Sequence, residues 1–486
     1  MRRKRTIYFN DARHYYLFVF EPPMKLEDAW RPIDEVAASP VDTFVYGVAR
    51  GDGLYYPSKV GKMFKYGEHD QFKEFRQAAY WRTWHNMQSL MEQGLDPLKV
   101  LIDRAHKKGM DFFASLRLSF HEKMAPAWRV DRGGRGWVHE EVRAHQFAVL
   151  EELATCYDTE GVELDYPGSG ACFRAADAEP YTAVMTEWVG EVSRMVRNRA
   201  GGPGQVGARV YPTEAINKAM GLDVRTWLRE GLVDYVTPMV YAHNLVDSNM
   251  DFEWLAAAAH AADAAVYPMV QPDYYLEDER RHRTREHASL AMMRAAAANY
   301  WARGADGMYT WFLRWPLGDR EHRILSELAD ADLGAEGDKH YFVNRRSGAA
   351  DTAGYKTLLP LQIPVADAGV RHEIPFYIAD DIATAAERIR QVRLKIQIYD
   401  LVTADQLEIL LNGQSLEKEI CRRQYGEHLT PYNGMWMDFE LRAVRPRQGR
   451  NLLEIALLKR AAGLKSALVI EDVEIVVEYG AYPSRL

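Results

Sequence analysis

Two acidic residues stand near the end of a short apolar run, GVELDY, at residues 161–166. Glu163 and Asp165 are two positions apart, and side chains at that spacing in a β-strand point to the same side. In a parallel barrel both would face the interior, with Asp165 nearest the C-terminal end, where barrel enzymes hold their catalytic groups. We therefore expect a direct chemical role for Asp165. Glu163, one layer deeper, is either functional or a buried carboxylate paired with an arginine from the third predicted strand, 111–119.

Further polar and aromatic residues follow the other apolar runs at the same relative position. They are Arg117, His121, Arg209, Tyr211, Glu214, Tyr241, His243, Gln271, Asp273, Trp311 and Arg314. Carboxylates and arginines bind hydroxyl groups, and aromatic rings cover the apolar face of a sugar, so the set predicts a site for a polyhydroxylated ligand. For each aromatic residue, packing is the alternative. Glu214 is also explained as an acidic residue in the first turn of a helix.

Other catalytic chemistries have less support. No predicted strand carries a His-x-His pair and no H-E-x-x-H occurs, so we expect neither a metal nor a cofactor. His282 and His287 lie in DERRHRTREH, whose charges indicate a solvated helix face. There is no G-x-S-x-G motif, and no lysine for a Schiff base lies in the predicted barrel strands. Acid and base catalysis by carboxylates is what remains.

The residues are positioned by eight apolar runs that alternate with helix-like segments over residues 1–335. The runs are HYYLFVF (14–20), DTFVYGVA (42–49), DFFASLRLS (111–119), GVELDY (161–166), GARVYP (207–212), VDYVTPMVY (233–241), AVYPMVQP (265–272) and DGMYTWFL (306–313). Helical spacing marks Asp96–Lys108, Val142–Tyr157, Pro180–Arg199 and Glu286–Arg303. This alternation predicts an α/β fold, a (β/α)8 TIM barrel. An open doubly wound sheet competes, but no G-x-G-x-x-G follows the first run.

Residues 336–486 show short alternating strands instead, which predicts an all-β sandwich. In RQVRLKIQIYDL (390–401) apolar and polar residues alternate, and turns such as Asn412-Gly413 and Asn433-Gly434 separate later strands. Tyr425, Tyr432 and Trp436 suggest carbohydrate binding, although burial between the sheets is the commoner fate for Trp436 in its run GMWMDFEL. The junction has no long flexible linker, so we expect the sandwich to pack permanently on the barrel.

Composition narrows the class of protein. The 486 residues carry 61 Lys plus Arg against 69 Asp plus Glu, a net charge of −8 that argues against nucleic acid as a partner. Three scattered cysteines, Cys156, Cys172 and Cys421, predict free thiols rather than a disulfide framework. No apolar run approaches the ~18 residues of a membrane span, and the basic start MRRKRTIYFND lacks the apolar segment of a signal peptide. We therefore expect a cytoplasmic protein without a membrane partner.

Three segments together resemble a known group of proteins. GVELDYPGSG, GLDVRTWLREGLVDYVTPMVY and WPLGDREHRILSEL, in this order, are similar to bacterial glycosyl-hydrolase-like family 10 and related glycosidase families. The resemblance implies a (β/α)8 barrel joined to a small β-sandwich. It also implies that the family's acidic pair on the fourth strand corresponds to Glu163 and Asp165. The stretch from Arg117 to His121 has fewer polar residues than in those relatives.

These observations predict a glycoside hydrolase that acts on an oligosaccharide or glycoside with two carboxylates at the mouth of the barrel. Such a reaction needs one protonated acid for the leaving oxygen and one ionised carboxylate to attack the sugar or activate water. Asp165 is the expected ionised group, and Glu214 is preferred over Asp273 as the proton donor. The alternative is a non-catalytic protein of the same fold that binds carbohydrate or serves as a scaffold.

Overall fold

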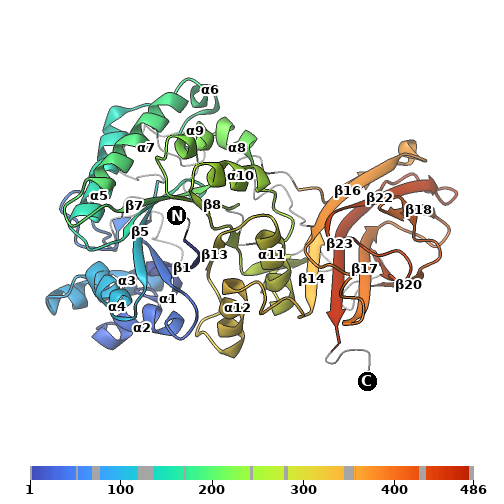
Figure 1. Cartoon of the computed structure of the whole chain (residues 1–486), viewed down its shortest axis with the longest axis horizontal. Coiled ribbons are helices and arrows are strands. Elements are labelled where there is room, and N and C mark those ends of the chain that lie inside the picture. Colours follow the sequence, from blue (N-terminus) through green and yellow to red (C-terminus); the bar gives the residue numbers. More distant parts are fainter. Residues whose placement is uncertain are drawn as a thin grey trace.

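The computed structural model describes residues 3–50, 53–67, 77–118, 136–168, 171–240, 245–277, 283–343, 355, 357–425 and 434–480. Figure 1 shows two parts along the chain. Helices surround a curled sheet in the N-terminal part, coloured blue to yellow, whereas the C-terminal part, coloured orange to red, consists of strands. Among the described residues, none of the helices is both long and apolar enough to cross a membrane.

The N-terminal part is a parallel barrel. Its strands are β1 (Arg5–Asp11), β2 (Thr43–Gly47), β5 (Asp111–Arg117), β6 (Gly161–Asp165), β7 (Gln205–Val210), β8 (Tyr235–Pro238), β9 (Ala265–Val266), β10 (Met269–Val270) and β13 (Gly307–Trp311). Each neighbouring pair is parallel. β9 pairs with β8 and β10 pairs with β13, and only Tyr267 and Pro268 separate the two pieces. Together β9 and β10 form the seventh of eight strand positions, so the barrel closes as predicted.

The first predicted strand is misplaced. Residues 14–20 do not form a strand, because the first barrel strand is β1 (Arg5–Asp11), which is followed by the short helix α1 (Ala12–Tyr15). An Asp11 side-chain oxygen accepts the backbone N–H of Arg13 at 2.8 Å and so caps that helix. Tyr16, Leu17 and Phe18 are buried in the core outside the strands. Apolar runs in a strand and in a buried turn look alike, which explains the error. The other seven runs each overlap a barrel strand.

Helices cover the outside of the barrel. The longer ones are α2 (Leu26–Val36), α3 (Gln77–Glu92), α4 (Pro97–Lys107), α5 (Glu140–Thr155), α7 (Thr182–Arg197), α10 (Glu253–Ala261), α11 (Leu290–Ala302) and α12 (Asp319–Ala329), with shorter α6 (Ala175–Ala178), α8 (Glu214–Ala219) and α9 (Val224–Arg229). In α4, Leu98, Leu101, Ile102 and Ala105 are buried at helical spacing, and an oxygen of Asp96 caps the N-terminus. Burial of that apolar stripe against the strands holds the helix in place.

One predicted helix begins later than expected. α11 starts at Leu290, where the Ser289 hydroxyl accepts the backbone N–H of Met292 at 3.1 Å. The preceding residues form β12 (Arg283–His287), antiparallel to β11 (Asp273–Glu277). The interpretation of this charged stretch as a helix face is therefore wrong for residues 283–287, because cross-strand pairing with β11 overrides the local charge pattern. β3 (Ala49–Arg50) and β4 (Gly53–Leu54) form a second, smaller hairpin.

The C-terminal part is a β-sandwich, as predicted. One sheet contains β14 (Lys339–Val343), β23 (Leu468–Tyr479), β17 (Ile389–Tyr399), β21 (Met435–Glu440) and β20 (Ile420–Tyr425), with β15 (Leu361–Ile363) beside β23. The other contains β16 (Arg371–Ile378), β22 (Gly449–Lys459), β18 (Gln406–Leu411) and β19 (Gln414–Ser415), and the short 3-10 helix η5 (Val365–Asp367) precedes β16. Val392, Leu394, Ile396 and Ile398 of β17 point into the common core. Strict alternation along the strand produces this arrangement.

Trp436 does not lie between the sheets. Its neighbours Met435 and Met437 are buried in the sandwich core, whereas Trp436 is half-buried on the opposite face of β21, where the ammonium of Lys395 lies 4.5 Å from its ring centroid. Because successive side chains of a strand point to opposite faces, Trp436 points away from the core, although its run GMWMDFEL predicted burial between the sheets. Tyr432 and the side chain of Tyr425 lie outside the described residues.

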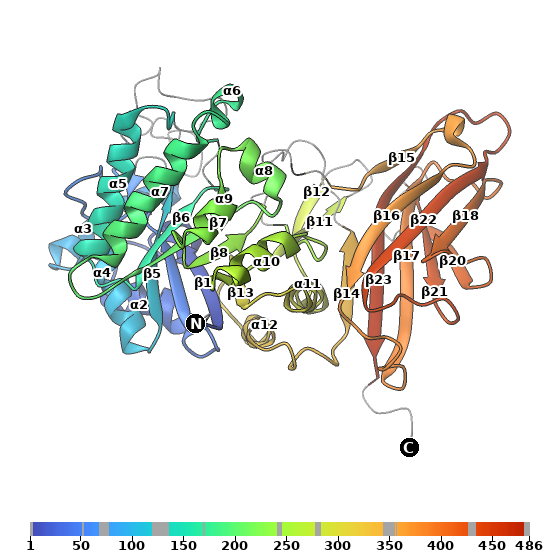
Figure 2. The same cartoon turned by 45° about the horizontal axis from the view of Figure 1, so that its top comes forward.

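The barrel and the sandwich meet along α11. Ala295 of this helix is completely buried within the sandwich core. Asn299, also completely buried, donates to the carbonyl of Tyr377 at 2.9 Å and accepts the backbone N–H of Ala379 at 2.9 Å. Figure 2 shows α11 beside β14 at this junction. Because the buried Asn299 amide is hydrogen-bonded to the sandwich through both its nitrogen and its oxygen, it holds α11 against the sandwich.

Candidate active site

Glu163 occupies the centre of the barrel and is completely buried. It accepts four hydrogen bonds, from Arg209 Nε at 2.8 Å, Ser115 Oγ at 2.8 Å, and the hydroxyls of Tyr235 and Tyr309 at 3.1 Å each. Burial and the Glu163 carboxylate raise the pKa of Tyr235, so this phenol remains a donor. The four donors match the acceptor capacity of a carboxylate, which favours a supporting role for Glu163.

The arginine that pairs with Glu163 is not the expected one. Arg209 comes from β7, the fifth barrel strand, whereas the prediction took the arginine from the third strand. That strand contributes Ser115 to Glu163, and its Arg117 lies beside Asp165 instead. The register explains the exchange, because Arg117 and Arg209 lie level with Asp165 on either side of β6.

Asp165 ends β6 one layer above Glu163 and is 1% exposed. Its Oδ1 accepts the backbone N–H of Gly168 at 3.0 Å, and its Oδ2 lies 3.4 Å from Arg117 Nε and 3.5 Å from Arg209 Nη1. Burial lowers the pKa of Arg209, but the negative charges of Asp165 and Glu163 outweigh burial and raise it above its ordinary value. Two guanidinium groups therefore stabilise negative charge on Asp165.

Gln271 and Trp311 lie at the same end of the barrel and bind each other. Trp311 Nε1 donates to Gln271 Oε1 at 3.2 Å, and Gln271 Nε2 donates to the carbonyl of Val240 at 2.5 Å. The Trp311 indole is completely buried and packs edge-on against Phe9 and His14. This environment fits the packing alternative for Trp311 better than a platform for a sugar. Tyr211, predicted at the same end, is also buried.

Asp273 lies against a histidine. It is the first residue of β11, is 1% exposed, and its Oδ1 lies 3.1 Å from His287 Nδ1 on the paired strand β12. His287 is partly exposed, with 37% of its side chain accessible. A carboxyl group and an imidazole at this distance can exchange a proton. The β11–β12 hairpin, seen in Figure 2 between the barrel and the sandwich, positions this pair.

Glu214 stands in the first turn of α8 and is held by two cations. Its carboxylate forms a two-pronged pair with Arg225 at 2.9 and 2.8 Å and contacts Lys218 Nζ at 3.0 Å. The hydrogen bonds from Arg225 and Lys218 lower the pKa of Glu214 to about 2. A proton donor needs a raised pKa, so this geometry favours the helix-end interpretation of Glu214.

The remaining predicted ligand-binding residues divide into two groups. Arg314 is exposed beyond the end of β13. His121, Tyr241 and His243 lie outside the described residues.

The misplaced first strand concealed two residues at this end of the barrel. Asp11 ends β1 and binds Arg13, whose charge, together with those of His14 and Arg117, lowers the pKa of Asp11 well below its usual range despite burial. His14 Nε2 lies 3.9 Å from Asp11 Oδ1, and burial lowers the pKa of His14 to about 3. The sequence signal was present, because RTIYFND contains a continuous run of β-branched and aromatic residues, Thr6–Phe9, as expected for a strand buried on both faces.

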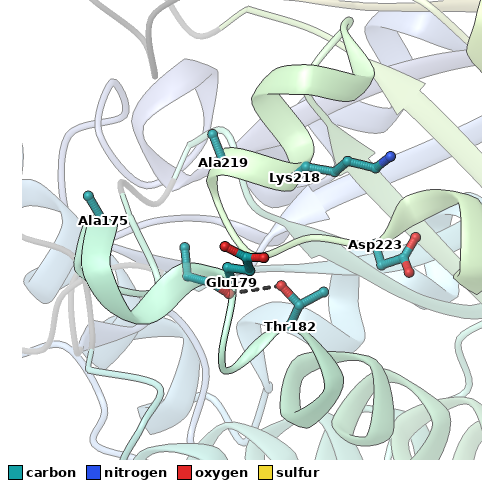
Figure 3. A pocket seen from close by; sticks show the side chains of 7 residues that line it. Ala175, Glu179, Thr182, Lys218, Ala219 and Asp223 are labelled. Atoms are coloured by element: carbon teal, nitrogen blue, oxygen red, sulfur yellow. Dashed lines mark hydrogen bonds between the residues drawn. The ribbon is translucent and has the colours of Figure 1, made fainter.

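A cavity of about 550 Å³ lies beside the same end of the barrel, between α6, α8 and the start of α9. Figure 3 shows Glu179, Lys218 and Asp223 around it. Asp223 caps α9 by accepting the N–H of Thr226 at 3.1 Å, and Lys218 is paired with Glu214. Because Asp223 is engaged in a helix cap and Lys218 in an ion pair, we place the candidate site at the strand ends. Within the described ranges, no three His, Cys, Asp or Glu side chains are grouped to hold a metal ion.

Comparison with known proteins shows likeness in structure only. No family model matches the chain, and no curated protein does. Among solved structures, α-L-fucosidase isoenzyme 2 from Paenibacillus thiaminolyticus is 12% identical with a TM-score of 0.44, covering 69% of this chain and 50% of that enzyme. An α-L-fucosidase from Vibrio sp. strain EJY3 is 11% identical with a TM-score of 0.41, covering 97% and 96%. A GH29 α-L-fucosidase from Bacteroides thetaiotaomicron is 10% identical with a TM-score of 0.39, covering 93% and 84%.

This chain thus spans half the length of the Paenibacillus enzyme and nearly all of the Vibrio one. At these identities and TM-scores the activities in those names remain statements about those proteins. The resemblance to glycosyl-hydrolase-like family 10 stays a prediction.

Proposed function

We propose that this protein is a glycoside hydrolase in which Asp165 and Asp273 act as the two carboxylates. The proposal rests on where the two residues lie. Both are 1% exposed; Asp165 ends the fourth barrel strand, and Asp273 follows the seventh. Strand positions three apart in a ring of eight lie nearly opposite each other. Hydrolysis of a glycosidic bond requires carboxyl groups on opposite sides of that bond.

The surroundings of the two residues suit different roles. Arg117 and Arg209 stabilise negative charge on Asp165, which suits the group that attacks the anomeric carbon or activates water. Asp273 contacts His287, whose partly exposed imidazole can resupply a proton from solvent. In this proposal Asp273 delivers a proton to the leaving oxygen, while Arg117 binds a substrate hydroxyl beside Asp165.

Two other carboxylates are less suited to donating a proton. Glu214 is ion-paired to Arg225 and Lys218 with a pKa of about 2. The pKa of Asp11 is also well below its usual range, and its oxygens accept three hydrogen bonds from Arg13. Both groups are therefore ionised at neutral pH, which is the wrong state for a general acid.

Aryl glycosides with good and poor leaving groups test the proposal. Asp165→Asn should lower kcat on the order of 10³-fold on every active substrate, because its charge acts in the transition state. Asp273→Asn should lose far more activity on poor leaving groups than on good ones, since a good leaving group departs without protonation. Glu214→Gln is the matched control on the same barrel end and should retain activity.

Two outcomes would redirect the assignment. Loss of activity in Glu214→Gln with normal rates in Asp273→Asn would make Glu214 the proton donor. If the wild type binds sugars but hydrolyses no glycoside, the non-catalytic carbohydrate-binding alternative holds.

A further inference from the structure

A second cavity, of about 300 Å³, lies where the barrel meets the sandwich. The segment that follows β8 supplies Asp247 and Asn249, and the sandwich part supplies Tyr355, Leu358 and Tyr377. Small-molecule sites commonly occur between domains, and this volume is at the lower end of their usual range of ~300–1,000 Å³. None of the residues assigned to the reaction lines this cavity.

Three consecutive residues, Asp247–Asn249, fasten one wall of the cavity to the sandwich, and we call them the clasp. Asp247 Oδ2 accepts the hydroxyl of Tyr355 at 3.0 Å, and Ser248 Oγ donates to the carbonyl of Phe342 at 2.9 Å. Asn249 Oδ1 accepts the backbone N–H of Tyr377 at 3.1 Å. A wall held by bonds from each residue is already ordered before a ligand binds, which reduces the entropic cost of binding.

The polar groups of the cavity favour a ligand with hydroxyl groups. Asp247 is 6% exposed, and each of its two oxygens accepts one hydrogen bond, from the N–H of Asn249 at 3.0 Å and from the hydroxyl of Tyr355. A carboxylate accepts about four hydrogen bonds, so Asp247 has capacity for about two more. Hydroxyl groups in the cavity would supply them.

The charges argue against an anionic ligand. Arg303 is committed to the carbonyl of Met250 at 2.7 Å and to Asp251 and Glu253 at 3.0 and 3.1 Å. Arg450 also pairs with Glu253. Asp247, Asp251 and Glu253 therefore outnumber Arg303 and Arg450, and an anionic ligand is disfavoured.

Apolar and aromatic residues also line the cavity. Leu358 is 42% exposed at the cavity rim, and Pro375 is also exposed there. Tyr377 adds an aromatic ring, over which the Arg303 guanidinium lies 5.2 Å from the centroid. A cavity that combines a carboxylate with apolar and aromatic residues suits a sugar ring, which has hydroxyl groups and an apolar face.

The chain segment that lines the cavity is hydrogen-bonded to the backbone of Asp273 in the candidate active site. The backbone N–H of Val246, the residue before the clasp, donates to the carbonyl of Asp273 at 2.7 Å. Consecutive Cα atoms are 3.80 Å apart, so Asp247 lies within a few ångströms of the Asp273 backbone. We propose that this cavity binds a neutral sugar ring of the substrate, adjacent to the bond that is cleaved. The link to cleavage rests on the proposed function, whereas the binding site itself does not.

Blocking the cavity tests this inference in the full-length chain. Leu358→Trp adds a large ring at the exposed rim, and Leu464→Trp, at a sandwich position that is 38% exposed and outside the cavity lining, is the matched control. Binding of an array of short neutral oligosaccharides is measured with both variants made in the Asp165→Asn background, to prevent turnover. We expect Leu358→Trp to weaken binding at least about tenfold and Leu464→Trp to leave it unchanged, with equal melting temperatures.

Equal affinities in the two variants, or no binding of any array member by Asp165→Asn itself, would overturn the inference. The two proposals fail separately. Binding that is lost in Leu358→Trp, without hydrolysis by wild type, removes the hydrolase but keeps the sugar site. Hydrolysis of longer oligosaccharides with a KM that Leu358→Trp leaves unchanged removes the sugar site but keeps the hydrolase.

Discussion

Arg209 and Glu163 form an ion pair at the centre of the barrel, with Nε and Oε1 2.8 Å apart and neither side chain exposed. A second nitrogen of the same guanidinium lies 3.5 Å from Asp165. The Arg209 guanidinium thus contacts both Glu163, which supports the fold, and Asp165, which is proposed to act in catalysis. A change at Glu163 therefore alters the support of Asp165 as well as the fold.

Glu163→Gln should cost both stability and activity. The variant leaves the charge of Arg209 without its closest partner in a site with no access to water, and broken buried pairs cost ~3–5 kcal/mol. Urea unfolding followed by circular dichroism measures the loss, beside kcat on an aryl glycoside. An unchanged unfolding midpoint together with an inactive protein would contradict the supporting role and move Glu163 into the chemistry.

Gly168→Ala should disturb Asp165 without touching the strand core. A Cβ at Gly168 would lie 2.5 Å from Asp165 Oδ2 and 3.0 Å from Arg117 Nε, so one of those groups must shift. We expect kcat to fall by on the order of tenfold or more, because small displacements of catalytic groups are costly. Gly190→Ala, in α7, is the control, since its Cβ would meet only Leu232 atoms at 3.9 Å. Equal rates in both variants would show that Asp165 does not take part.

His14 should make stability depend on pH. Burial lowers its pKa from 6.5 to about 3, although Asp11 opposes this and Arg13 and Arg117 reinforce it. Between these pH values His14 binds a proton in the unfolded chain but not in the folded chain. The contribution of His14 to stability is therefore complete above pH 6.5 and decreases as the pH falls towards 3.

A comparison with His14→Gln separates the effect of His14 on stability from the effects of other groups that titrate at acidic pH. The unfolding free energy of wild type relative to the variant should decrease by about 1.4 kcal/mol per pH unit between those limits. Denaturant titrations across this range provide the measurement. Parallel curves for the two proteins would mean that His14 has the same pKa in the folded and unfolded chain, which would contradict the prediction.

A barrel cut from the sandwich should be unstable. Residues 1–335 alone would leave Ala295 in water, and Asn299 would lose its partners at Tyr377 and Ala379. We expect this fragment to be insoluble or to melt well below the full chain, because exposed apolar surface promotes aggregation. Its solubility and melting temperature are the readouts. A soluble fragment with full activity would show that the sandwich is a detachable accessory.

The local pattern of the sequence was sufficient for the fold class and for one carboxylate pair. Alternating apolar runs and helical segments indicate a barrel, and period-two alternation indicates a sandwich, because burial on one or both faces imposes these repeats. The same period places Glu163 and Asp165 on one side of β6 with Asp165 at its end. Such features depend on residues close together in the chain.

Only the tertiary structure determined which side chains pair with the candidate carboxylates. The register of the neighbouring strands β5, β6 and β7 determines that Glu163 pairs with Arg209 and Asp165 with Arg117, and hairpin pairing brings His287 to Asp273. Glu214 and Arg225 meet because of how α8 and α9 pack, which converts a candidate acid into an ion pair. Strand β1 escaped recognition because an aromatic turn at 16–18 is as apolar as a strand. Local patterns report burial, but the groups that surround a charge come from distant segments, and they set its role.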